Sequence, residues 1–175
     1  MDSNPIKSQL QEYIYSTVHA KVQENGIGTG CCVLAAGITA KLLFKRGHKA
    51  IIQAGTAQWP RIHPHQDDGV SPTHFGYVWE PDSPRNKLIQ SLGYLPELHA
   101  WCAILPSHEI IDMTTGLVAE NCLKMIGADW PGPKLPPYIW ATPQDLPDRV
   151  IYHPHLEPTE LVSKLIIDMI KDGTI

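Results

Sequence analysis

The sequence predicts an α+β domain in which helices pack on a mostly antiparallel sheet. Two segments with helical patterning come first, and several short segments with strand patterning follow them. Helices and strands that are grouped in this way, rather than strictly alternating, are typical of the α+β class. The 175 residues suit one domain over 1–175, and the 43% of hydrophobic residues suffice for a core without disulfides.

Two helices are expected in the first 46 residues. Pro5 to Glu24 forms the first, because its apolar residues recur every four positions and make one stripe. The second runs from about Cys31 to Arg46 and is stopped by Gly47. It is apolar nearly all round until Lys41, which predicts that it is buried. The stripe of the first helix consists of Ile6, Leu10, Ile14, Val18 and Val22.

The middle of the chain carries the strand signals. Lys49 to Ala54 reads as a short strand, 55–71 as a loop, and Thr73 to Glu80 as a second strand. Two further runs, His99 to Leu105 and Glu109 to Met113, form a hairpin around Pro106 and Ser107. The pattern of the segment 87–97 is ambiguous.

The last third alternates between regular and irregular segments. Leu117 to Ile126 is expected to be a helix, and Asp129 to Pro147, with six prolines, an irregular covering segment. Arg149 to His153 is the expected last strand, and Thr159 to Lys171 the last helix.

Composition argues against several functional classes. The net charge is 14 − 18 = −4, so the chain lacks the basic surface that nucleic acid requires. The longest apolar stretch, Cys31 to Ala40, is far shorter than the roughly 20 residues of a membrane span. The first residues, from Met1 to Pro5, do not resemble a signal peptide. Four cysteines without an export signal lead us to expect reduced thiols and a cytoplasmic protein.

Three residues carry the chemistry: Cys32, His99 and Asp112. Cys32 follows a glycine-rich turn, residues 26–30, and stands at the expected start of a helix. A helix N-terminus stabilises a thiolate, and its unpaired N–H groups can receive the oxyanion of a tetrahedral intermediate. A thiol, an imidazole and a carboxylate are the groups that nucleophilic acyl transfer needs.

Strand parity relates the imidazole to the carboxylate. If the hairpin closes around Pro106 and Ser107, residues that face each other have numbers that sum to about 213, so any odd sum places His99 and Asp112 on one face. The carboxylate can then hold the imidazole in one tautomer. Cys102 points to the other face and is expected to be an inert core thiol.

The same segments resemble the transglutaminase-like superfamily. Residues 30–36 and 46–50 are similar to its nucleophile helix and to the turn that ends it, with Cys32 rather than Cys31 in the nucleophile position. His99-Ala100-Trp101 looks like the family's His-Ala-Trp strand, and residues 111–114 like its Leu-Asp-Pro-Thr strand, with Met113 in place of proline. The resemblance covers residues 29–54 and 97–116.

The resemblance implies a papain-like core and a Cys32-His99-Asp112 triad. It further implies a thiol-dependent amide hydrolase or acyltransferase that needs no cofactor and acts on a peptide or amide substrate. Hydrolysis is preferred over transfer because water is always present. The segments 55–98 and 129–147 are expected to line or cover the substrate groove.

One part of the family's site is missing. No tryptophan precedes Trp59, so the tryptophan that serves the oxyanion in some family members has no counterpart. The second oxyanion donor is unidentified, and Gln23 and Asn25 are the nearby candidates.

The sequence also allows other interpretations. The chain could be a non-catalytic or metal-binding domain, because His63, His65, His153 and His155 form two His-Pro-His segments on extended backbone. Cys32 could be a buried helix thiol and His99 a core histidine. An arylamine acetyltransferase-like use of the triad would need an acyl-CoA donor.

The aromatic face of the strand over 73–80 also allows two readings. It is formed by Phe75, Tyr77 and Trp79. Such a face belongs to the core more often than to a ligand site.

Overall fold

The structure of the chain is a computed structural model. It describes residues 5–26, 30–60, 74–127, 129–130, 134–147 and 149–175. Within them it has mixed helices and strands, and every pairing among the described strands is antiparallel. The α+β class and the antiparallel sheet that the sequence predicts are therefore confirmed.

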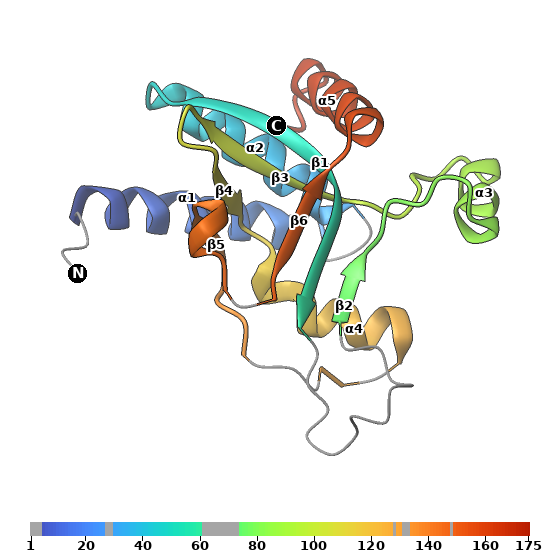
Figure 1. Cartoon of the computed structure of the whole chain (residues 1–175). Coiled ribbons are helices and arrows are strands. Elements are labelled where there is room, and N and C mark those ends of the chain that lie inside the picture. Colours follow the sequence, from blue (N-terminus) through green and yellow to red (C-terminus); the bar gives the residue numbers. More distant parts are fainter. Residues whose placement is uncertain (1–4, 27–29, 61–73, 128, 131–133, 148) are drawn as a thin grey trace.

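Helices cover one face of the sheet (Figure 1). The helix α1 spans Pro5–Glu24 and α2 spans Cys31–Lys45, so both predicted helices are confirmed in position. The helix α2 packs on the sheet as well as on α1, and α5 (Leu156–Lys171) packs on both α2 and the sheet. The prediction that α2 is buried is correct, because eight of its residues are buried.

Among the described residues the sheet has six strands, and β1 pairs with three of the others. The hairpin of β3 and β4 follows the predicted segments closely. The strands are β1 (Lys49–Pro60), β2 (His74–Tyr77), β3 (His99–Leu105), β4 (Glu109–Asp112), β5 (Ile139–Ala141) and β6 (Ile151–Pro154).

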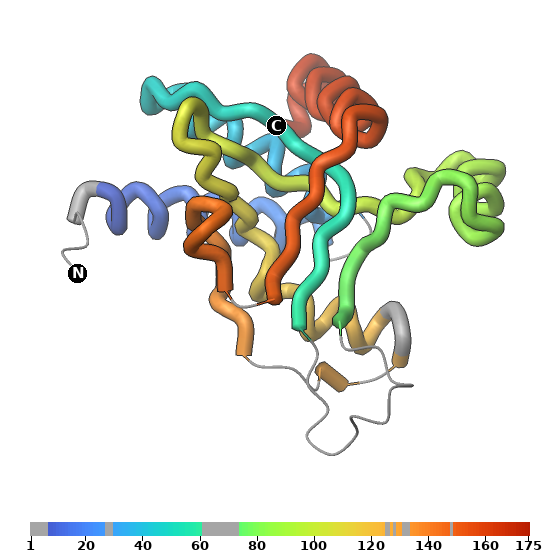
Figure 2. Tube along the Cα trace, viewed as in Figure 1, coloured from blue at the N-terminus to red at the C-terminus, as the bar shows by residue number. Residues whose placement is uncertain are grey.

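Strand β1 changes partners along its length, and Gly55 stands at the change. Gly55 pairs with His99 of β3 on one edge and with Pro154 of β6 on the other. Two residues later, Ala57 pairs with β2 and β6. Because β6 keeps its edge throughout, β2 and β3 lie one after the other along the opposite edge, and Figure 2 shows β6, β1 and β2 side by side.

Two hydrophobic clusters cover the two faces of the sheet. Even-numbered residues of β3, such as Cys102, lie in the cluster that contains α1 and α2. Odd-numbered Trp101 lies in the other cluster, together with Trp59. This alternation is the usual two-residue period of a strand, and it places His99 on the Trp101 face.

Some predicted boundaries are wrong, and two of the differences come from strand pairing. The segment 55–60, expected to be a loop, extends β1 because β2 and β6 flank it. The segment expected to be wholly irregular contributes β5, which pairs with β4. The helix α5 begins three residues before Thr159.

The described residues also include the helices α3 and α4. The helix α3 (Pro84–Ser91) begins before the ambiguous segment 87–97 and covers its first five residues. It starts where the Ser83 hydroxyl accepts a hydrogen bond from the Asn86 N–H. The helix α4 (Val118–Ile126) follows a short 3-10 turn at Thr115–Leu117. Among the described residues, no helix is both long enough and apolar enough to cross a membrane.

Candidate active site

Cys32 lies in the first turn of α2, as predicted. Gly30 precedes the helix with φ of 90°, a left-handed conformation that favours glycine, and its carbonyl accepts hydrogen bonds from the N–H groups of Val33 and Leu34. The N–H of Cys32 comes too early in the helix to have an intrahelical acceptor. Cys32 therefore joins a half-buried thiol to a backbone donor at the positive end of the helix dipole.

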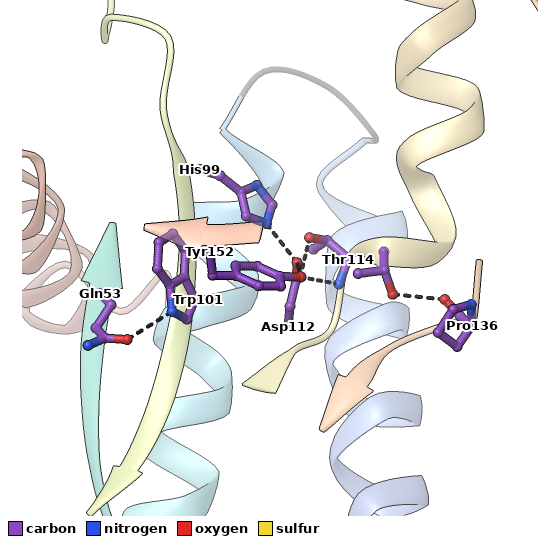
Figure 3. Close-up of polar contacts among 8 residues, drawn as sticks. Gln53, His99, Trp101, Asp112, Thr114, Pro136 and Tyr152 are labelled. Atoms are coloured by element: carbon purple, nitrogen blue, oxygen red, sulfur yellow. Dashed lines mark hydrogen bonds and ion pairs between the residues drawn. The ribbon is translucent and has the colours of Figure 1, made fainter. Parts of the chain in front are cut away.

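His99 and Asp112 form a buried pair. Cys102 pairs with Ile111 across the hairpin, so paired residue numbers sum to 213 as the sequence predicts. The His99 and Asp112 side chains are 4% and 1% exposed, and Nε2 of His99 lies 2.8 Å from Oδ2 of Asp112 (Figure 3). Because a carboxylate only accepts hydrogen bonds, Nε2 carries a proton.

Asp112 accepts four hydrogen bonds: one from His99, one from Tyr152 and two from Thr114. The Tyr152 hydroxyl donates to Oδ2 at 2.7 Å, the same oxygen that faces His99. The Thr114 N–H and hydroxyl donate to Oδ1 at 2.9 and 2.7 Å. Burial alone would raise the pKa of Asp112, but the charge and hydrogen bond of His99, together with Thr114 and Tyr152, outweigh it and lower the pKa.

The environment of His99 favours its charged form. Burial lowers the pKa of the imidazole, but the charge and hydrogen bond of Asp112 raise it by more than burial lowers it. The Cys32 side chain raises the pKa further. Together they raise the pKa of His99 to about 10. The second ring nitrogen, Nδ1, is buried and makes no hydrogen bond of normal geometry within the described residues, although the Cys32 thiol is near enough to act on the ring.

Aromatic rings hold the imidazole in place. The Tyr77 ring stacks on it with centroids 5.5 Å apart and planes 12° apart. Trp59 meets it edge-on, with centroids 5.1 Å apart at 90°. The ring is therefore packed on several sides as well as hydrogen-bonded.

Cys32 and His99 open onto one pocket of about 560 Å³. Tyr77 and several residues of 85–98 line its walls, which agrees with the expectation for the segment 55–98. The described residues of 129–147 do not line this pocket, so the matching expectation for that segment is wrong for them. Pro143 and Leu146 instead line a second pocket on the Trp101 face.

The other cysteines separate as parity predicts. Cys102 is fully buried, its thiol donates to the Ala36 carbonyl at 3.1 Å, and burial raises its pKa. Cys122 is also fully buried. Cys31 lines the same pocket as Cys32, but Cys32 is the thiol that raises the pKa of His99.

The two suggested oxyanion donors are not at the pocket. The Asn25 amide donates to the Lys21 carbonyl at 2.9 Å, and the Gln23 amide lies 3.5 Å from the His19 ring. Both side chains are exposed at the end of α1, and neither lines the pocket. Those two suggestions from the sequence are therefore wrong.

The histidines proposed for a metal are only partly described. The rings of His153 and His155 lie 4.7 Å apart and nearly perpendicular, while His63 and His65 lie outside the described residues. Within the described residues, no group of three or more His, Cys, Asp or Glu side chains is placed to hold a metal ion.

The sequence does not indicate three residues that surround His99 and Asp112. Thr114 had a local signal, because a threonine two residues after an aspartate often donates to its carboxylate. The sequence shows Tyr77 only as part of an aromatic face. Tyr152 is 40 residues from Asp112, and nothing in its local sequence announces the contact.

Comparison of the chain with protein-family models, curated proteins and solved structures found no match.

Proposed function

We propose that the protein is a thiol-dependent amide hydrolase or acyltransferase that acts through Cys32, His99 and Asp112. The observation that carries the proposal is the buried His99–Asp112 pair, which opens onto the same pocket as a thiol in the first turn of a helix. The likeness of 29–54 and 97–116 to transglutaminase-like proteins supports the same reading, with α2 on the sheet as the papain-like core.

The first half of the reaction forms an acyl-enzyme. Sγ of Cys32 attacks the carbonyl carbon of the amide, and the π electrons move onto the oxygen, which accepts a hydrogen bond from the Cys32 N–H. The intermediate collapses as the C–N bond breaks, and Nδ1–H of His99 gives its proton to the leaving amine. Asp112 holds the imidazole through Nε2.

The second half releases the acyl group. Water, or an amine in a transferase, attacks the thioester carbonyl while Nδ1 of His99 accepts the proton of the attacking group. The C–S bond then breaks, and Cys32 is regenerated as the thiolate beside the imidazolium. Hydrolysis remains the preferred outcome because water is always present.

The raised pKa of His99 identifies the resting state of the proposed site. With a pKa of about 10, the imidazole holds both ring protons at neutral pH. An imidazolium beside a cysteine is the setting in which cysteine nucleophiles are activated. This arrangement favours a reactive thiol over a buried structural one.

Iodoacetamide tests the proposal without knowledge of the substrate, because it alkylates thiolates. At pH 6 we expect Cys32 in native protein to react at least about tenfold faster than in urea-unfolded protein. His99→Gln should remove the advantage, whereas the neighbouring Cys31→Ser should leave it unchanged. Peptide mapping by mass spectrometry gives the rate at each cysteine.

Two outcomes oppose the proposal. If native Cys32 reacts no faster than the unfolded chain, the thiol is not activated and a non-catalytic domain is favoured. The metal-binding alternative would be favoured if protein purified without a tag contains stoichiometric metal and the His153→Ala variant does not.

A further inference from the structure

The proposed reaction leaves one group without an assignment. A tetrahedral intermediate carries its negative charge on one oxygen, and sites of this kind commonly aim two donors at it. The Cys32 N–H provides one donor. The amides of Gln23 and Asn25, which the sequence suggested, bond elsewhere. The second donor must therefore be another polar group that lines the pocket.

Few side chains of the pocket meet the requirement. The Thr114 hydroxyl already donates to Asp112. The Tyr94 side chain lines the wall but is 68% exposed, so water competes for its hydroxyl. Tyr77 and Asn121 remain as neutral donors.

Tyr77 is placed beside the triad by the sheet. It is the last residue of β2, and β2 lies in line with β3 along the same edge of β1. The chain leaves the sheet after Tyr77 and re-enters it at His99, so the two rings become neighbours. They stack 5.5 Å apart, and Trp59 and Phe75 pack edge-on against Tyr77.

The Tyr77 hydroxyl is available to donate a hydrogen bond to a substrate. Among the described residues none accepts a hydrogen bond from it, whereas the hydroxyl of Tyr152 is committed to Asp112. Burial raises the pKa of Tyr77 above its usual range, and the negative charges of Cys32 and Cys31 add to the effect. The hydroxyl therefore keeps its proton. It is also near enough to Cys32 for the charge on Sγ to act on it, and Sγ is the atom to which the carbonyl carbon would bond.

We propose that the Tyr77 hydroxyl is the second oxyanion donor, opposite the backbone N–H of Cys32. The inference rests on the proposed function. When Sγ of Cys32 bonds to the carbonyl carbon and the π electrons move to oxygen, that oxygen accepts hydrogen bonds from both groups. When the C=O bond reforms, the leaving group departs and both donors are released unchanged.

Two probes of the same thiol separate this role from a purely structural one. Alkylation of Cys32 by iodoacetamide displaces iodide at a saturated carbon and forms no oxyanion. Acylation by p-nitrophenyl acetate passes through a tetrahedral intermediate and releases p-nitrophenolate. An oxyanion donor accelerates the second reaction and leaves the first unaffected.

The decisive variant is Tyr77→Phe, which keeps the ring stacked on His99 and removes only the hydroxyl. We expect the rate of single-turnover acylation at pH 7 to fall at least about tenfold, after the background rate of Cys32→Ser is subtracted. Loss of one oxyanion donor costs about 100- to 1000-fold in established enzymes, so a tenfold fall is a conservative threshold. Alkylation at pH 6 should keep the wild-type rate, which also shows that the fold is intact. Tyr13→Phe, an exposed tyrosine of α1 that does not line the pocket, should change neither rate.

The other outcomes each decide against the inference. If both rates fall together in Tyr77→Phe, the tyrosine acts on the thiol or on His99. If acylation is unchanged, or falls only in Asn121→Ala, the donor is another group. If wild-type Cys32 shows neither fast alkylation nor acylation, the proposed function itself fails, which these paired rates distinguish from a failure of Tyr77 alone.

Discussion

At the scale of single residues, Asp112 presents the sharpest physical demand. A buried carboxylate without partners is strongly destabilising, because it loses its hydration. Here two donors face each oxygen, and one of them is the imidazole. The aspartate, its strand and its shared face with His99 follow from sequence. Its bond to Tyr152 does not, because that contact depends on where β6 meets the sheet.

The His99–Asp112 pair should make stability depend on pH. The pKa of His99 rises from 6.5 to about 10 on folding, so its contribution is complete below pH 6.5 and is lost as the pH rises through 10. The pKa of Asp112 is lowered from 3.8, so its contribution is complete above that value and is lost at lower pH. The pair therefore stabilises most between about pH 4 and 6.5.

Urea unfolding of wild type and His99→Gln from pH 5.5 to 10 measures this contribution. The difference in free energy of unfolding between the two proteins should shrink as pH rises above 6.5, by at most about 1.4 kcal/mol per pH unit for one proton. Subtracting the variant removes the titration of other groups. A difference that stays constant over the range would show that His99 does not titrate as its surroundings require.

At the scale of elements, the critical feature is the exchange of partners along β1. Helices α1 and α2 and the β3–β4 hairpin could be predicted because their signals are local: a four-residue stripe, an apolar run and a proline turn. The second half of β1 could not, because glycine and proline around it are typical of loops. It becomes a strand only because β2 and β6 supply hydrogen bonds on both edges.

Gly55 allows this exchange, and Gly55→Ala should disrupt it. A Cβ there would lie 2.4 Å from the His153 carbonyl oxygen, so β6, which carries Tyr152, must move. We expect a loss of about 1–3 kcal/mol in the free energy of unfolding, as for other overpacked sites. Because Tyr152 supports Asp112, alkylation of Cys32 at pH 6 should also slow.

Gly47→Ala is the matched control. Gly47 also has a positive φ, of 80°, but nothing lies within 4 Å of an added Cβ. That variant should lose stability through backbone strain alone, about 1–2 kcal/mol, and keep the wild-type rate at Cys32. If Gly55→Ala keeps that rate as well, the position of β6 does not matter to the triad.

At the scale of the whole molecule, burial divides the cysteines into two groups. Cys102 and Cys122 are fully buried, in the clusters on opposite faces, whereas Cys31 and Cys32 line the pocket at one end of α2. We expect iodoacetamide at pH 8 to modify the second group in native protein and the first only through global unfolding.

Mass spectrometry across a urea series tests this division. Modification of Cys102 and Cys122 should rise with urea in parallel with the change in tryptophan fluorescence that accompanies unfolding. Trp59 and Trp101, which are buried in the native protein, report that change. Rapid labelling of Cys102 without urea would mean that the interface between α2 and the sheet opens locally, which contradicts a core that unfolds as one unit.

The sequence by itself determined the parts whose causes are local. Helix patterning placed Cys32 in the first turn of α2, and the two-residue period of the hairpin put His99 and Asp112 on one face. Only the tertiary structure decided what surrounds them: Tyr77 beside the imidazole, Tyr152 on the carboxylate, and a pocket walled by 85–98. Those neighbours depend on strand pairings between segments up to about a hundred residues apart, such as Gly55 with Pro154, which no local pattern encodes.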